Sequence, residues 1–219
     1  MSLDAKSPVE TKYKELFKNQ KHELAIQYLR DNKDEFDPAL YHYNLAVNYA
    51  KMDQLPLARF HFEKAKDSGF YSLELSKNLE QVKELMGVSR VEEKTSFTDY
   101  VFETGLSLST YTGANVSLIL FIVFLFQMKK ISRWWLKVLI AALTLAPLTG
   151  QLYLKENYDQ MLAMDKKQVL RGPSAIFEKN QEVPAGMKYV ASKNYSGWRY
   201  IVSPSSHKGW TRNERAKEL

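Results

Sequence analysis

The chain has 219 residues, of which 45% are apolar and 26% are charged, and it contains no cysteine. This apolar content is enough to build a core and argues against wholesale disorder, and the lack of cysteine excludes disulfides, thiolate nucleophiles and cysteine-ligated zinc. Charge is unevenly spread: residues 1–100 hold 15 basic and 17 acidic side chains, residues 101–160 hold 5 and 3, and residues 161–219 hold 11 and 5. The charge-poor middle predicts a membrane segment between two polar regions.

Residues 1–90 are predicted to form an array of paired helices, with the clearest repeat at 39–72. Small and large apolar residues recur there at helical spacing, counted from Ala39: Leu45, Ala46, Tyr49, Ala58, Phe62 and Ala65. This order resembles the tetratricopeptide repeat, a helix–turn–helix of about 34 residues with small side chains where the helices cross. His42 departs from the pattern, because an aromatic residue is usual at its position. Weaker patterns predict a preceding repeat and a closing helix: Tyr13, Leu16, Phe17, Ala25, Leu29 and Pro38, then Leu75, Leu79, Val82 and Leu85.

The inner face of such an array is the predicted partner-binding groove. Repeats of this kind bind peptides or partner helices along the face formed by their first helices. By the count from Ala39, this face carries Tyr43, Val47 and Lys51. The alternative, that each of them only packs against the next repeat, stays open.

Two long apolar stretches follow a predicted linker at 91–104. Residues 105–128 contain no charged side chain, and residues 134–154 contain one, Lys137. A hydrocarbon core about 30 Å thick needs about 20 helical residues, so each stretch is predicted to be a transmembrane helix. A buried helical hairpin of a soluble domain is the alternative. Aromatic residues typical of membrane interfaces flank the second stretch: Trp134, Trp135, Tyr153 and Tyr158.

The loop between the two stretches, residues 129–133, sets the predicted topology. The basic residues in and beside it are Lys129, Lys130, Arg133 and Lys137. Short basic loops remain in the cytoplasm, so both large flanking regions are expected in the periplasm. Export of the N-terminal region requires a signal peptide, and residues 1–6 contain no apolar run. Either a signal was removed or both flanks are cytoplasmic; we expect the former.

After a predicted linker at 155–164, residues 165–219 are expected to form a small β barrel. Short apolar strands, at 175–177 and 198–202 among others, alternate with turns containing glycine and proline. The order of these turns and the two tryptophans resembles the bacterial Src-homology-3-like (SH3-like) domain. The aromatic residues of its predicted ligand face are Tyr189, Tyr195, Trp198, Tyr200 and Trp210. The tyrosines are expected to be exposed, whereas a core role for Trp198 and Trp210 stays open.

No motif for catalysis or cofactor binding is found. The sequence lacks a glycine-rich phosphate loop, a Gly-x-Ser-x-Gly motif and a His-Glu-x-x-His motif. His42 and His61 share a repeat, but two histidines without a placed carboxylate make a poor metal site. The basic residues near the C-terminus are scattered rather than striped, which does not favour nucleic-acid binding. We therefore expect no enzymatic activity, no cofactor and no nucleic-acid partner.

The predicted fold class is a multidomain membrane protein: an α-helical tetratricopeptide repeat array, a two-helix transmembrane hairpin and a small SH3-like β barrel. This architecture resembles the BatE-type proteins of the bacterial aerotolerance (Bat) operon. The resemblance implies a scaffold in the bacterial inner membrane that serves a stress-response complex. It also implies partners, namely membrane proteins with von Willebrand factor A domains and a MoxR-type AAA+ ATPase.

Two other functions remain open from the sequence. The first is a cell-wall-binding anchor, in which the SH3-like domain binds peptidoglycan and the repeats recruit an envelope protein. The second is a chaperone adaptor tethered to the membrane. Topology separates the second from the scaffold, because the adaptor requires cytoplasmic repeats.

Overall fold

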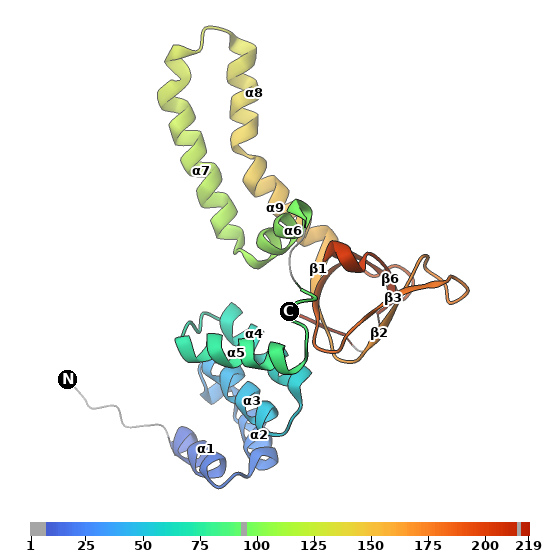
Figure 1. The fold of residues 1–219 in the computed structure, drawn as a ribbon. Coiled ribbons are helices and arrows are strands. Elements are labelled where there is room, and N and C mark those ends of the chain that lie inside the picture. The colour runs from blue at the N-terminus through green and yellow to red at the C-terminus, as the bar shows by residue number, and fades with distance from the viewer. Residues whose placement is uncertain (1–7, 93–95, 214–215) are drawn as a thin grey trace, which may run out of the picture.

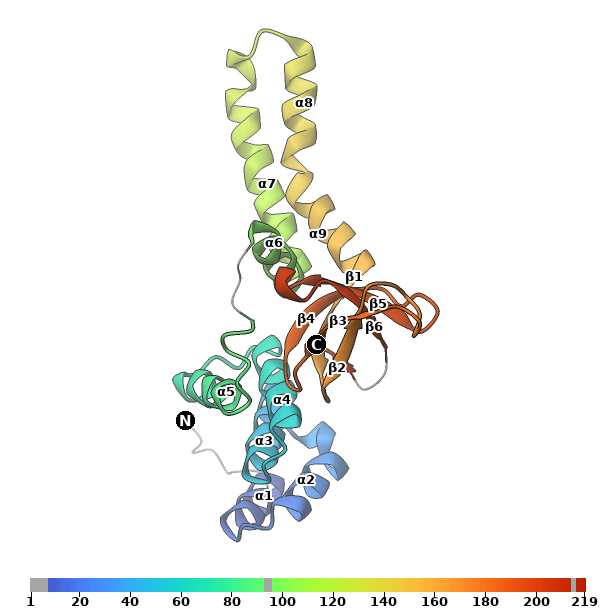
Figure 2. The same cartoon turned by 45° about the vertical axis from the view of Figure 1, so that its right-hand side comes forward.

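The computed structural model describes residues 8–92, 96–213 and 216–219. This part of the chain contains nine α-helices and one seven-stranded antiparallel sheet, so the fold is mixed, with helices preceding the sheet. Five helices form an N-terminal helical unit: α1 (Pro8–Lys18), α2 (His22–Asp31), α3 (Pro38–Lys51), α4 (Leu55–Asp67) and α5 (Leu73–Leu85). A 3₁₀ turn, η1 (Lys33–Glu35), connects α2 to α3. Figures 1 and 2 show a long helical hairpin projecting away from this unit and from the sheet.

Capping groups and prolines set where the helices of the helical unit begin. The Asp37 carboxylate accepts hydrogen bonds from the backbone N–H groups of Ala39 and Leu40, and Pro38 follows it, so α3 starts with a capped N-terminus. Pro56 lies in the first turn of α4 for the same reason. Every residue of the count from Ala39 is buried in the core of the unit or at its edge: Ala39, Leu45, Ala46, Tyr49, Ala58, Phe62 and Ala65.

The segment predicted as a linker at 91–104 contains a helix. Residues Phe97–Ser107 form α6, and Thr110–Gln127 form α7, so the predicted first apolar stretch is broken before its main helix begins. The break arises because Ser109 is extended and its hydroxyl accepts a hydrogen bond from the N–H of Tyr111, which caps a new helix. With the 3₁₀ turn η2 (Met128–Lys130), α7 is long and apolar enough to cross a membrane.

The second apolar stretch is also divided, into α8 (Trp134–Thr144) and α9 (Ala146–Asn157). The two helices are bent by 42° and reach a membrane-spanning length only when taken together. Pro147 explains the bend, because proline removes one helical hydrogen bond and crowds the preceding turn. The N–H of the next residue, Leu148, donates to the Ser117 hydroxyl of α7 at 3.2 Å, which ties the bend to its neighbour.

The sheet starts earlier than predicted, because residues 155–164 contain the end of α9 and the first strand instead of a linker. The strands are β1 (Tyr158–Ala163), β2 (Lys167–Leu170), β3 (Lys179–Val183), β4 (Lys188–Ser192), β5 (Trp198–Ser203), β6 (Gly209–Arg212) and β7 (Ala216–Glu218), with the 3₁₀ turn η3 (Ser205–His207) before β6. Their order is β3-β2-β6-β5-β4-β1-β7, with β3 and β7 at the edges. The strand predicted at 175–177 is wrong: these residues lie in the β2–β3 connection.

Alternating burial along β5 confirms the period-two pattern predicted for residues 198–202. Arg199 and Ile201 are buried, whereas Trp198 and Tyr200 are only partly buried. The core of the sheet includes Met161, Val169 and Met187, and it also contains Val88 from the segment after α5. The segment that follows the helical unit thus contributes directly to the core of the sheet.

Candidate docking site between the helical unit and the sheet

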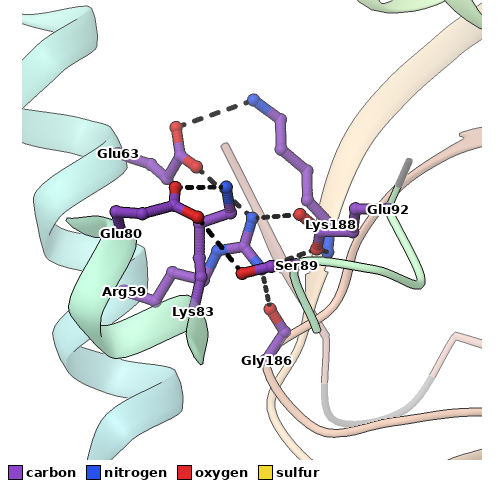
Figure 3. Close-up of polar contacts among 8 residues, drawn as sticks. All are labelled: Arg59, Glu63, Glu80, Lys83, Ser89, Glu92, Gly186 and Lys188. Carbon is purple, nitrogen blue, oxygen red and sulfur yellow. Dashed lines mark hydrogen bonds and ion pairs between the residues drawn. The ribbon is translucent and has the colours of Figure 1, made fainter. Parts of the chain in front are cut away.

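A buried arginine of α4 joins the helical unit to the sheet (Figure 3). Arg59 is 1% exposed, and its guanidinium binds both oxygens of the Glu92 carboxylate, with Nη1–Oε1 at 2.5 Å and Nη2–Oε2 at 2.6 Å. Nη1 also donates to the backbone oxygen of Gly186, in the turn before β4, at 2.6 Å. A guanidinium fork suits this bidentate geometry, so the contact fixes orientation as well as distance.

Two further charges complete the network. Glu63, one turn after Arg59 in α4, has one carboxylate oxygen 3.6 Å from Arg59 Nη2 and the other 3.7 Å from Lys188 Nζ of β4. Burial alone would raise the pKa of the Glu63 carboxyl, but Lys188 and Arg59 outweigh it, and the net pKa is lowered. The backbone N–H of Lys188 donates to Glu92 at 2.5 Å. Glu92 therefore receives hydrogen bonds from both units.

An apolar contact lies beside these ion pairs. Gly186 has a φ of +79°, and a Cβ at this position would lie 2.2 Å from the sulfur of Met86, so the close approach requires glycine. Val88 is fully buried among residues of the sheet. A polar rim closes the site, where Glu80 accepts from Lys83 at 2.9 Å and from Ser89 at 3.3 Å (Figure 3). The arrangement holds two units in one relative orientation.

The histidine pair noted in the sequence lies elsewhere in the helical unit. The Nδ1 atoms of His42 and His61 are 3.0 Å apart, and His61 stacks on Tyr49. Burial, followed by the proximity of His42, lowers the pKa of His61 to about 3. Within residues 8–92, 96–213 and 216–219, no group of three or more histidine, aspartate or glutamate side chains is placed to hold a metal ion.

The predicted groove residues fall on one face but differ in burial. Val47 and Lys51 line a cavity of about 170 Å³ between α3, α4 and α5, together with Val82 and Leu85. Lys51 is exposed. Tyr43 is half-buried; its ring packs on Phe62 and Phe70, and its hydroxyl accepts a hydrogen bond from Asn78 at 3.2 Å. Tyr43 thus packs within the helical unit, which was the alternative left open from the sequence.

The predicted aromatic face of the sheet domain is divided by the fold. The prediction that Tyr189 is exposed is wrong, because this side chain is only 2% exposed and lies in the core of the sheet. Tyr195 is exposed, and Tyr200 packs edge-on against Trp210 with ring centroids 5.4 Å apart. Trp198 lines a cavity of about 440 Å³, where the Arg212 guanidinium lies 5.5 Å from its ring centroid.

The predicted topology determinants lie together at the distal end of the hairpin. Lys129 and Lys130 belong to η2, Arg133 immediately precedes α8, and Lys137 lies in its first turns. Figure 1 shows that this end of the hairpin is the farthest from the helical unit and the sheet. The length of the hairpin therefore separates the basic loop from the helical unit and from the sheet.

Sequence reasoning missed the docking site as a whole. The sequence analysis assigned no role to Arg59 or Glu63, and it placed Glu92 in the predicted linker at 91–104. One signal was present: Arg59 follows Ala58, so it lies next to the position where the helices cross. Its partner Gly186 is 127 residues away in the chain, and nothing in the sequence pairs them.

Comparison with protein-family models, with curated proteins and with solved structures gives no match for this chain.

Proposed function

We propose that the protein is a non-enzymatic scaffold of the bacterial inner membrane, whose helical unit and sheet form one body on one side of the bilayer. The observation that carries this proposal is the contact of Arg59 with Gly186, because Arg59 precedes the apolar helices in the chain and Gly186 follows them. Two units joined by a buried ion network lie on the same side of a membrane. The chain between them must therefore cross the bilayer an even number of times.

Two crossings satisfy this requirement. The length and composition of α7 suit one crossing, and α8 with α9 reach the same length as one bent span. Lys129, Lys130 and Arg133 then mark the cytoplasmic end, which assigns the helical unit and the sheet to the periplasm. This hairpin is the two-span arrangement expected from the sequence.

The proposed partners follow from the resemblance to the Bat operon proteins. The helical unit has a groove at Val47 and Lys51, which we assign to the repeat array, and we assign the seven-stranded sheet to the SH3-like domain. We assign the groove to membrane proteins with von Willebrand factor A domains, which in turn engage a MoxR-type AAA+ ATPase. Joining two weak contacts on one anchor raises their effective concentration, so the assembly can be tight although each contact is weak.

Co-purification of the full chain in mild detergent tests the scaffold function. We expect recovery of a von Willebrand factor A protein with the unmodified chain and a marked loss with Lys51→Glu. Lys18→Glu, which makes the same charge change on exposed α1, is the matched control and should retain the partner. Equal recovery with both variants would contradict the groove assignment.

A second candidate function, peptidoglycan binding by the sheet domain, is favoured by the cavity at Trp198. Cations line it, with Lys179 and Arg212 among them, and the aromatic side chains of Phe177 and Trp198 add apolar surface suited to a sugar. Sedimentation of the full chain with purified sacculi tests this function. Loss of binding on Trp198→Ala, with Tyr71→Ala in the helical unit as an exposed aromatic control, would support the anchor over the scaffold.

A further inference from the structure

Helix α6 exposes a stripe of large apolar side chains at the foot of the hairpin. Phe97 is 82% exposed and Tyr100 is 53% exposed, and Val101 lies beside them on the same face, since residues three and four apart share one side of a helix. Figures 1 and 2 show α6 lying across the base of α7 and α9. A soluble helix normally turns such a face inward.

The opposite face of α6 is fixed to the sheet domain. Asp99 is fully buried, and its carboxylate accepts hydrogen bonds from the N–H and the hydroxyl of Ser205 at 2.9 and 2.6 Å. Phe102 packs edge-on against Tyr158 of β1, with ring centroids 4.8 Å apart. These contacts set the rotation of α6 about its own axis. The apolar stripe is therefore held away from the sheet.

The stripe continues into an apolar groove of about 710 Å³ between α6, α7 and α9. Thr104 and Leu108 line it from α6 and the residue after it, and Val116 joins it to the exposed apolar surface of α7. Gln151 of α9 also lines the groove; its Nε2 donates to the backbone oxygens of Leu108 and Ser109 at 2.8 and 3.1 Å. Within the described residues, the buried Oε1 of Gln151 has no hydrogen-bond partner.

We infer that α6 is an interfacial helix, which lies on the bilayer surface with its stripe at the boundary between headgroups and acyl chains, and that a phospholipid acyl chain occupies the groove. The occupant follows from continuity, because the groove opens onto the surface of α7 that the proposed hairpin places in the hydrocarbon. Aromatic side chains are enriched at this depth. The inference rests on the proposed membrane hairpin and adds a lipid contact that lies outside the two spans.

The charge of α6 defines the class of lipid. The helix carries Asp99 and Glu103 but no lysine or arginine. Its attachment therefore depends on apolar burial, unlike basic amphipathic helices that require anionic headgroups. Zwitterionic phospholipid alone is sufficient.

Site-directed spin labelling tests the inference directly, because the chain has no native cysteine. The purified full chain, as Val101→Cys, Thr104→Cys, Val123→Cys or Ser76→Cys, is placed at one copy per nanodisc of zwitterionic phosphatidylcholine. Accessibility to oxygen and to a water-soluble nickel chelate is then measured. We expect a several-fold higher oxygen-to-nickel ratio at Val101 and Thr104 than at Ser76, and the highest ratio at Val123. Circular dichroism confirms that each variant is folded.

The outcomes separate this inference from the proposed function. A ratio at Val101 equal to that at Ser76, with Val123 deep in the bilayer, would overturn the interfacial helix and leave the hairpin intact. A Thr104 label shielded from both reagents would show that protein fills the groove, and it would overturn the acyl-chain assignment. If the oxygen-to-nickel ratio at Val101 rises only after anionic lipid is added, attachment of α6 through apolar burial alone would be refuted. A Val123 label as accessible to the nickel chelate as the Ser76 label would contradict the proposed membrane hairpin itself.

Discussion

Arg59 carries a full charge at a position where its side chain is buried, and its partners determine the energetic consequence. Burial of an ion is costly unless the geometry of the pair is close to ideal, and the bidentate contact with Glu92 has that geometry. Glu63 lies 3.6 Å from Arg59 and adds a second negative charge, which Lys188 balances at 3.7 Å. Removing the Arg59 cation would leave two carboxylates, Glu63 and Glu92, with the single positive charge of Lys188 beside them.

Arg59→Ala is accordingly expected to be strongly destabilising, by about 3–5 kcal/mol in the free energy of unfolding, because it removes the bidentate partner of Glu92 and leaves Lys188 to balance two carboxylates. Arg59→Lys should recover only part of this loss, since an ammonium cannot hold both oxygens of Glu92 and Gly186 at once. Chemical denaturation of the full chain in detergent measures both changes. Arg90→Ala, at an exposed position, is the control. Similar stability of Arg59→Ala and Arg90→Ala would contradict a structural role for the network.

His61 predicts a pH dependence of stability. Its pKa is lowered from an ordinary value of 6.5 to about 3 in the folded protein, so the unfolded chain binds more protons between these values. The free energy of unfolding should be highest above pH 6.5 and should fall as the pH is lowered through this range. His61→Phe should flatten the decline between about pH 6.5 and 5, where aspartate and glutamate contribute little. Thermal unfolding of the unmodified chain and of His61→Phe measures stability as a function of pH. Parallel profiles for the two proteins would refute this role of His61.

At the scale of elements, the crossing of α3 and α4 depends on small side chains. Ala46 and Ala58 are fully buried there. Ala58→Leu should cost about 1–3 kcal/mol, because added methylenes cannot be placed without shifting a helix. Glu84→Leu adds the same side chain at an exposed position of α5 and should change stability little. The urea unfolding midpoints of Ala58→Leu and Glu84→Leu are then compared. Equal midpoints would show that the helix crossing can accommodate a larger side chain without loss of stability.

The sequence predicted the elements best where one periodicity extended over many residues. The helices at 39–65 and the alternation along β5 follow directly from apolar spacing, because burial of one face imposes it. Boundaries were less predictable where a single side chain decides them. The Ser109 cap divides the first apolar stretch, and Pro147 bends the second; both lie within runs whose hydrophobicity alone indicates continuous helices.

Contacts between distant parts of the chain could not be predicted in this way. The pairing of Arg59 with Gly186, and that of Asp99 with Ser205, joins residues more than a hundred positions apart. Each depends on the three-dimensional path of the apolar hairpin, which local patterns do not contain. Tyr189 illustrates the same difficulty at one position: its strand was identified, but the face turned to the core depends on the register with β1.

For the whole molecule, the docking of the helical unit on the sheet and the proposed even number of bilayer crossings depend on each other. In the proposed membrane arrangement, contact between Arg59 and Gly186 requires that the chain returns to the side of the bilayer from which it left. Under the same proposal, the basic residues at the distal end of the hairpin give the orientation in the bilayer. The return of the chain and its orientation can both be tested by finding on which side of the membrane three exposed residues lie: Ser76 in α5, Ser132 in the hairpin turn and Ser206 in η3.

The most direct measurement is the reactivity of single cysteines at these positions with a membrane-impermeant maleimide in intact cells. Because no native cysteine competes, Ser76→Cys, Ser132→Cys and Ser206→Cys can each be read alone. We predict that Ser76→Cys and Ser206→Cys react before lysis, and that Ser132→Cys reacts only after the inner membrane is opened. Reaction of Ser76→Cys and Ser206→Cys on opposite sides of the membrane would contradict the docked, two-span architecture.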